Sequence, residues 1–168
     1  MFNKLKKHPW LYGFMQLLIV IIIFLSVRAY KLKDAINGEA PIIMGQLLTG
    51  QQINLKQYRG HPVLVHFWAT WCPICKIENS SIASIANDLP VLTIASWSEG
   101  AKEVVEYMHS ENLQMPVLLD ESGEWAKLYG VKGVPSSFIV DGNGHVQFVT
   151  SGYTTELGLR LRMWWLDN

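Results

Sequence analysis

The segment from Phe67 to Lys76, with the sequence FWATWCPICK, constrains the fold of this 168-residue chain more than any other. It begins in a run of β-branched and aromatic side chains, which is typical of a buried strand, and a proline after Cys72 is typical of a helix start. We therefore expect a strand that passes directly into a helix. A helix N-terminus has unpaired N–H groups and a positive dipole end, which favour the thiolate form of Cys72. Cys72 is the expected nucleophile, and Cys75, one turn further on, can close a disulfide with it.

The chain lacks the companion residues that other uses of a Cys-x-x-Cys pair require. A structural zinc site takes four ligands, usually two such pairs or one pair with two spaced histidines, and there is no second cysteine pair. Covalent haem attachment needs a histidine directly after the second cysteine, where Lys76 stands. A static structural disulfide stays open as an alternative, although the strand-to-helix context favours a redox-active pair. We expect no metal and no bound cofactor.

This motif and the later sequence GVPSSF, at Gly133–Phe138, together resemble the membrane-anchored, thioredoxin-like TlpA/ResA family over about residues 40–166. Within that family, the chain looks most like the thioredoxin-like branch linked to suppression of copper sensitivity, a group of protein disulfide oxidoreductases. The resemblance implies an α/β thioredoxin fold with an N-terminal β-hairpin and a central helix-strand insertion. It also implies protein or peptide disulfides as substrates and a membrane thiol–disulfide protein as the electron donor.

The resemblance assigns roles to further residues around the dithiol. Pro135 matches the family's cis-proline, in a loop that faces the two cysteines. The backbone of Val134 is expected to pair with a substrate peptide by strand addition. The other expected substrate contacts are Trp71, directly before Cys72, and Pro73 and Ile74, between the two cysteines.

Two titratable residues near the dithiol are candidates for proton transfer. Glu78 lies one turn beyond Cys75 on the apolar stripe of a helix expected to end near residue 87 or 88. Burial raises the pKa of a carboxyl, so Glu78 could exchange a proton with the buried thiol, and the family carries an acid at this position. His66 interrupts the buried strand at Pro62–Trp68, where thioredoxins carry an aspartate. It is either a proton relay for Cys75 or a hydrogen-bonded core histidine.

Residues 10–27 form an uncharged apolar run near the N-terminus. As a helix this run would be ~27 Å long, close to the ~30 Å of a bilayer's hydrocarbon core. We expect an uncleaved anchor in the lipid bilayer rather than a cleaved signal peptide, because the run is long and Arg28 interrupts the cleavage-like sequence after it. Basic residues flank both ends, so charge barely orients the helix. The resemblance implies a single-pass protein of the bacterial inner membrane with its redox domain on the periplasmic side.

The expected organisation is a cytoplasmic N-terminus at residues 1–9, a transmembrane helix at 10–27, a tether at 28–40 and a thioredoxin-like domain at 41–168. Within the domain, strands are expected at 62–68, 90–96, 116–119, 137–140 and 145–150, helices at 99–110 and 124–129, and a hairpin at 47–55.

Two helices of the domain have predicted buried faces. Val104, Val105 and Met108 suit one face of the helix at 99–110. The final helix is predicted to start at a Thr154 cap and to bury four residues: Leu157, Leu161, Trp164 and Trp165. Most of the seven tryptophans are expected to pack in the core.

The combined expectation is a membrane-tethered protein thiol–disulfide oxidoreductase that reduces protein disulfides through Cys72 and Cys75. A formal net charge of zero gives no electrostatic support for nucleic-acid binding. Two alternatives stay open: a disulfide-forming oxidase of the same fold, and a metal-handling protein in which both thiolates bind Cu(I). Further soft ligands for copper are scattered along the chain, at Met44, Met108, Met115 and His145.

Overall fold

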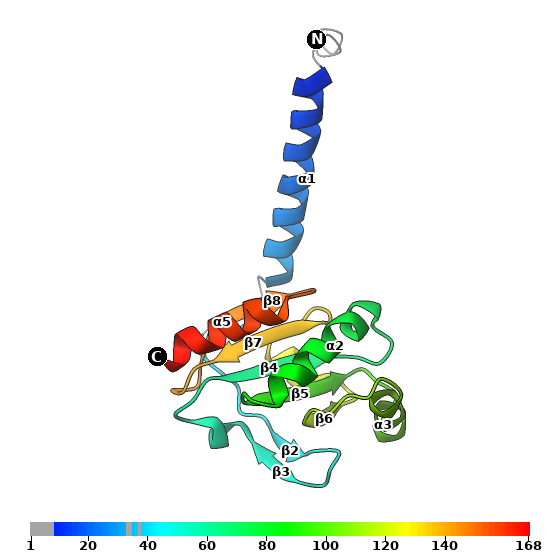
Figure 1. Ribbon diagram of the computed structural model, residues 1–168, viewed down its shortest axis with the longest axis vertical. Helices are drawn as coiled ribbons and strands as arrows, with labels where there is room; N and C mark the ends of the chain where they lie inside the picture. Colours follow the sequence, from blue (N-terminus) through cyan, green and yellow to red (C-terminus); the bar gives the residue numbers. More distant parts are fainter. Residues whose placement is uncertain (1–8, 33–34, 37) are drawn as a thin grey trace.

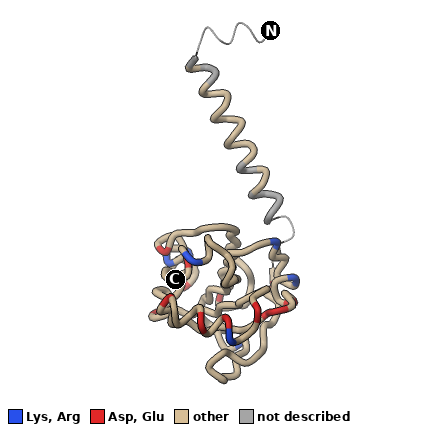
Figure 2. The backbone as a smooth tube through the Cα atoms, turned by 90° about the vertical axis from the view of Figure 1, so that its right-hand side faces the viewer, with Lys and Arg blue, Asp and Glu red and all other residues tan. Residues whose placement is uncertain are grey.

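The computed structural model describes residues 9–32, 35–36 and 38–168. Most of the expected N-terminal segment 1–9, and residues 33, 34 and 37 of the expected tether, lie outside this part of the chain. The elements in chain order are α1 (Pro9–Leu32), β1 (Gly38–Glu39), β2 (Met44–Gln46), β3 (Gln52–Asn54), η2 (Leu55–Tyr58), β4 (Val63–Trp68), α2 (Pro73–Ala86), β5 (Val91–Ser96), α3 (Ala101–Ser110), β6 (Val117–Asp120), α4 (Glu124–Leu128), β7 (Ser136–Val140), β8 (His145–Ser151) and α5 (Glu156–Asp167). Helix α1 projects away from the domain that contains the sheet (Figure 1), as the perpendicular view also shows (Figure 2).

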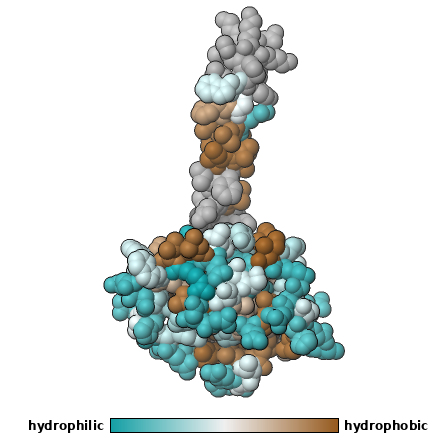
Figure 3. All heavy atoms as spheres, in the orientation of Figure 1, coloured by the Kyte–Doolittle hydropathy of each residue, from teal (hydrophilic) through white to brown (hydrophobic). Residues whose placement is uncertain are grey.

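Helix α1 runs from Pro9 to Leu32, past the expected end at residue 27. Apolar side chains along its middle are exposed, among them Leu17, Val20 and Ile22 (Figure 3). Among the described residues, no helix combines the length and the apolarity that a bilayer crossing requires. Part of the expected tether is ordered, because β1 pairs with β8 at the edge of the sheet.

Six strands form one mixed sheet in the order β1-β8-β7-β4-β5-β6. Strands β4, β5 and β6 are parallel, whereas β7 is antiparallel to both β4 and β8, and β8 is antiparallel to β1. Every residue of β4 is buried, because this strand has neighbours on both sides and packed layers on both faces. Strands β2 and β3 form a separate hairpin. The predicted α/β architecture with an N-terminal hairpin is confirmed.

Two apolar clusters fill the space on the two faces of the sheet. The first contains Phe67, Tyr129 and Phe138, whose rings meet at centroid distances of 5.0 to 5.7 Å, beneath α4 and the hairpin. The second contains Leu64 and Trp68 and packs α2, α3 and α5 against the opposite face. Successive residues of β4 alternate between these clusters, as the pleat of a strand requires.

The final helix presents a different face to the core from the one predicted. Leu159 and Met163 are buried, whereas the four residues expected inside are 54–67% exposed: Leu157, Leu161, Trp164 and Trp165. The cap is Thr155 rather than Thr154, because its hydroxyl oxygen accepts a hydrogen bond from the Gly158 N–H at 3.2 Å. Apolar residues lie on more than one side of this helix, and periodicity alone selected the wrong side.

The expectation that most tryptophans pack in the core is also wrong. Trp68 is fully buried, but five of the seven are exposed: Trp10, Trp71, Trp97, Trp164 and Trp165. In α3, Val104 is buried while Val105, predicted to share its face, is 50% exposed, since adjacent helical residues point about 100° apart. Basic and acidic residues are interspersed along the backbone of the domain (Figure 2).

Candidate active site

The register between β4 and β7 brings the cysteine pair and the proline loop together. Phe67 on β4 lies opposite Ser136 on β7, so the segment that leaves β4 meets the segment that enters β7 at one end of the sheet. The Val134–Pro135 peptide bond is cis, as the resemblance predicts. Cys72 Sγ lies 3.6 Å from the Val134 carbonyl oxygen. The proline loop therefore faces the dithiol.

Cys72 and Cys75 form a disulfide at the start of α2. Cys72 is the N-cap residue, and its Sγ accepts a hydrogen bond from the Cys75 backbone N–H at 3.1 Å. Pro73 follows at the start of the helix, where its missing N–H leaves no bond unmade. Cys72 is 4% exposed, and Cys75 is completely buried. A substrate sulfur can therefore reach Cys72 first, and the N-cap position stabilises a thiolate there.

Apolar side chains lie around Cys72 where a substrate would approach. Trp71 is 60% exposed and Ile74 is 46% exposed, and Pro73 between them is exposed as well. Val134 is partly buried on the other side of the sulfur. The four residues predicted to contact substrate thus lie beside the accessible cysteine.

The carboxyl of Glu78 is fully buried on the inner side of α2. Its Oε1 accepts a hydrogen bond from the Thr154 backbone N–H at 3.3 Å, and its Oε2 has no hydrogen-bond partner within the described chain. Burial raises the pKa of Glu78 to about 7, and the hydrogen bond from Thr154 opposes this rise only in part. Residues three apart on a helix are neighbours, so this carboxyl lies one turn from Cys75.

His66 is buried beneath α2, on the face of β4 that also carries Leu64 and Trp68. Its Nδ1 lies 2.9 Å from Ser137 Oγ on the neighbouring strand. Burial lowers the pKa of His66 to about 3, and the polar side chain of Asn79 opposes this only in part. The imidazole is therefore neutral at pH 7.

Asn79 and Thr154 contribute to the site although neither was predicted to belong to it. Asn79 is fully buried one turn beyond Cys75, and its Nδ2 donates to the Tyr107 hydroxyl oxygen at 3.4 Å. The helical periodicity that identifies Glu78 also places Asn79 on the inner side of α2, so this residue could have been found. Thr154 supplies only a backbone N–H to Glu78, which no sequence pattern reveals.

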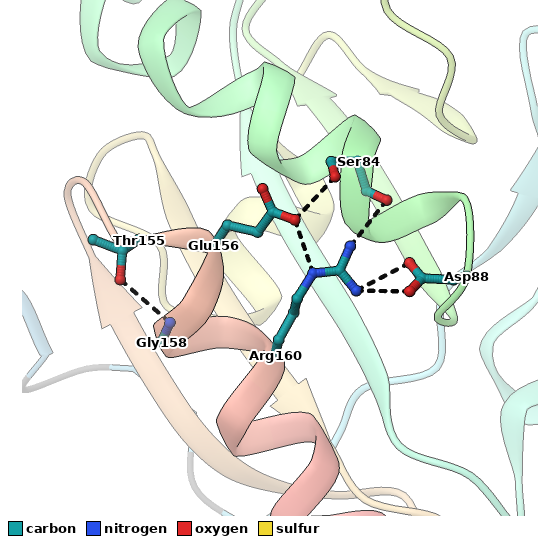
Figure 4. A network of polar contacts seen from close by, with 6 residues as sticks. All are labelled: Ser84, Asp88, Thr155, Glu156, Gly158 and Arg160. Carbon is teal, nitrogen blue, oxygen red and sulfur yellow. Dashed lines mark hydrogen bonds and ion pairs between the residues drawn. The ribbon is translucent and has the colours of Figure 1, made fainter.

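A polar network joins the far end of α2 to α5 (Figure 4). Arg160 donates from Nη1 to both carboxylate oxygens of Asp88, at 3.0 and 2.8 Å, and from Nε to Glu156 at 2.8 Å. Its Nη2 donates to the Ser84 carbonyl oxygen at 3.2 Å, in the last turn of α2, where a cation is favourable. The guanidinium lowers the pKa of both Asp88 and Glu156. The network fixes α5 against the helix that begins with the dithiol.

A metal centre has few donors to draw on. Within the described ranges, no three side chains of His, Cys, Asp or Glu group closely enough to hold a metal ion. The disulfide pairs the two sulfurs with each other. The arrangement is suited to thiol–disulfide exchange at Cys72, with Cys75 as the resolving thiol.

Comparison with known proteins gives a family and relatives. The model of the AhpC/TSA family matches residues 36–149. The thiol-disulfide oxidoreductase ResA of Bacillus thuringiensis subsp. konkukian is 31% identical over 159 residues, covering 84% of this chain and 87% of that protein. The thiol:disulfide interchange protein DsbE of Haemophilus influenzae is 29% identical, and the match covers 84% of this chain and 88% of that protein. A crystal structure of a thiol:disulfide interchange protein from Chlorobium tepidum has a TM-score of 0.70 at 24% identity, and the match covers 80% of this chain and 99% of that chain. This similarity confirms the thioredoxin-like fold.

Proposed function

Because the chain belongs to the AhpC/TSA family and is a protein-disulfide oxidoreductase related to ResA and DsbE, we propose that it reduces disulfides in protein substrates. The observation that carries the proposal is the unequal burial of the two cysteines. Cys72, which is 4% exposed, lies at the N-cap of α2 beside the proline loop, and Cys75 is completely buried one turn from the buried Glu78. This arrangement separates the residue that attacks substrate from the residue that releases it.

In the proposed reaction, the Cys72 thiolate attacks one sulfur of a substrate disulfide, and the other substrate sulfur leaves as a thiolate. Cys75 then loses its proton and attacks Cys72 Sγ in the resulting mixed disulfide. This second step releases the remaining substrate thiol and forms the Cys72–Cys75 disulfide. The substrate gains two electrons and the protein loses two. A second thiol protein must return these electrons by the reverse exchange, and we assign this role to a membrane thiol–disulfide donor.

Glu78 is the proposed acceptor of the Cys75 proton. A carboxyl with a pKa of about 7 is half protonated near neutral pH, so it can take up the proton and later return it. We assign His66 a positioning role. Its neutral ring, buried beneath α2 and hydrogen-bonded to Ser137 on β7, supports the strand and helix that carry the reacting groups.

The direction of the reaction is tested by the reduction potential of the Cys72–Cys75 couple, measured by equilibration of the full chain with dithiothreitol or glutathione buffers. The resemblance to the TlpA/ResA family supports reduction, and we expect a potential near that of thioredoxin, about −270 mV. A potential near −120 mV would identify a strong oxidant and reverse the proposed direction.

We further propose that residues 10–27 anchor the protein in the bacterial inner membrane, with residues 28–40 as the tether and the catalytic domain on the periplasmic side. The run has no charged residue, and apolar side chains of α1 are exposed rather than packed on the domain (Figure 3). Alkaline carbonate should leave the protein in the membrane pellet, and protease added to spheroplasts should digest the domain. Release by carbonate would contradict anchoring, and protection from protease would contradict the orientation.

A further inference from the structure

The backbone of Trp97 is held in a conformation that tryptophan rarely adopts. Its φ is +57°, in the left-handed region where bulky side chains are uncommon. Trp97 directly follows β5, and its N–H donates to the Asp120 carbonyl oxygen at 3.1 Å. Its indole lies against Gly123, where an added Cβ would collide with the ring. Strain of this kind persists only where the surrounding structure imposes it, and it is often found at functional sites.

This conformation directs the Trp97 carbonyl group at the side chain of Trp71. Trp71 Nε1–H donates to the Trp97 carbonyl oxygen at 2.8 Å. The Trp71 ring is 60% exposed and directly precedes the nucleophile Cys72. The hydrogen bond therefore fixes an exposed aromatic ring beside the reacting sulfur. A ring that is already ordered loses less conformational entropy when a partner binds to it.

Neighbouring residues hold the same segment from the same side. The Thr70 N–H donates to Ser98 Oγ at 3.3 Å, and Thr70 Oγ1 donates to Glu103 Oε1 at 2.6 Å. Glu103 Oε2 in turn accepts a hydrogen bond from the Glu99 N–H at 2.6 Å. The segment 97–103 thus supports the two residues before Cys72 through several bonds.

We propose that Trp97 is a positioning residue for substrate recognition. Through its carbonyl oxygen it holds the Trp71 indole as a preorganised apolar shelf, onto which apolar residues that flank a substrate cysteine pack. Ile74, 46% exposed on the helix behind Cys72, extends the same apolar surface. This proposal rests on the proposed function and names its substrate class: peptide disulfides flanked by apolar or aromatic residues. A small disulfide does not reach the shelf and is insensitive to it.

Three variants of the full chain separate the Trp97 carbonyl from its ring. Trp97→Asn and Trp97→Val both remove the indole, but asparagine tolerates the left-handed conformation and β-branched valine does not. Trp71→Phe keeps an aromatic ring and removes the N–H donor. Each variant, kept reduced by excess dithiothreitol with the uncatalysed reduction subtracted, is assayed in detergent on three disulfides: a peptide flanked by Phe and Leu, the same peptide flanked by Ser, and hydroxyethyl disulfide.

Trp97→Val and Trp71→Phe should raise KM for the apolar peptide about 3- to 10-fold with kcat little changed, as expected for one lost hydrogen bond that acts in binding. Trp97→Asn should keep KM closer to that of the unmodified protein. The two Trp97 substitutions should leave the Ser-flanked peptide and hydroxyethyl disulfide unaffected, and Trp71→Phe should change KM for these two disulfides less than for the apolar peptide.

Equal effects on the three disulfides would overturn the proposal, and so would equal KM values for Trp97→Asn and Trp97→Val. If Trp97→Val does not fold, Trp71→Phe decides by the same criterion. An unmodified protein that fails to reduce hydroxyethyl disulfide would instead contradict the proposed reductase function, so the two failures are distinguishable.

Discussion

The Glu78 carboxyl accepts a hydrogen bond from the Thr154 backbone N–H at 3.3 Å, which links α2 to the segment before α5. This bond favours the carboxylate, but burial disfavours it more strongly and raises the pKa of Glu78 to about 7. Glu78 therefore titrates in the pH range in which thiols and disulfides exchange in water. Its charge state should control the resolving thiol rather than the attacking one.

Glu78→Gln should slow the attack of Cys75 on the mixed disulfide and remove an inflection near pH 7 from the rate of that step. The expected fall at neutral pH is on the order of 100-fold, at the lower end for a lost general base. Rapid quenching after mixing with a substrate disulfide measures this step. The first attack, measured in a Cys75→Ser background, should keep its rate. An unchanged pH profile for resolution would contradict the role of Glu78.

Burial shifts the pKa values of Glu78 and His66 in opposite directions, so their effects on stability oppose each other. Glu78 keeps a proton in the folded protein that the unfolded chain loses above about pH 4.5; its contribution to the free energy of unfolding falls as pH rises through about 7. His66 stays neutral when folded but gains a proton when unfolded; its contribution is complete above pH 6.5 and is lost as pH falls towards about 3. Between pH 4.5 and 6.5 each group changes the free energy of unfolding by on the order of 1 kcal/mol per pH unit. The two slopes have opposite signs and largely cancel.

Single substitutions should reveal each slope. In Glu78→Gln the slope of His66 remains, so the free energy of unfolding should rise from pH 4.5 to 6.5. In His66→Asn the slope of Glu78 remains, so it should fall over the same range. Urea unfolding of the oxidised proteins across this range measures both. Parallel pH curves for both variants and the unmodified protein would show that neither buried group has a shifted pKa.

Cys75→Ser should trap a mixed disulfide between Cys72 and a substrate, because the accessible sulfur can still attack and the resolving sulfur is gone. Cys72→Ser should trap none, since Cys75 is completely buried. Non-reducing electrophoresis after incubation with a disulfide-bonded peptide distinguishes them. Trapping by the Cys72→Ser variant instead would reverse the assignment of the two cysteines.

A matched pair of leucines tests which face of α5 packs inward. Leu159→Ala removes a buried side chain and should lower the free energy of unfolding by about 2–5 kcal/mol. Leu161→Ala changes a side chain that is 54% exposed and should alter it by no more than about 0.5 kcal/mol. Urea unfolding of both variants provides the comparison. A larger loss of stability in Leu161→Ala than in Leu159→Ala would instead support the inner face predicted from the sequence.

The parts of the fold that local sequence determines could be predicted. β4 was recognisable because its residues are almost all apolar, and α2 because Pro73 marks its start and apolar residues recur with a helical period. The burial of Glu78 followed from the same period. The cis state of Pro135 needed the resemblance, since no local pattern distinguishes the isomer.

The parts that tertiary contacts determine could not be predicted. The orientation of α5 depends on Arg160 and Asp88, which lie 72 residues apart in the sequence. The support of Trp71 by Trp97 depends on a backbone carbonyl, which is present at every position and therefore leaves no trace in residue type. Periodicity identifies a helix but cannot choose between two apolar sides when a polar network decides the orientation.

A short segment connects α1 to strand β1 at the edge of the sheet. Five residues separate α1 from Gly38, and two of them pack on the domain: Ala35 is buried, and the Ile36 N–H donates to the Tyr129 carbonyl oxygen at 3.2 Å. Strand β1 pairs with β8 at Val146, which lies opposite Val140 on β7. The proline loop adjoins Ser136, at the other end of β7. If α1 were fixed in place, it would therefore restrain the domain through β1, at the end of the sheet opposite to the proline loop and the dithiol.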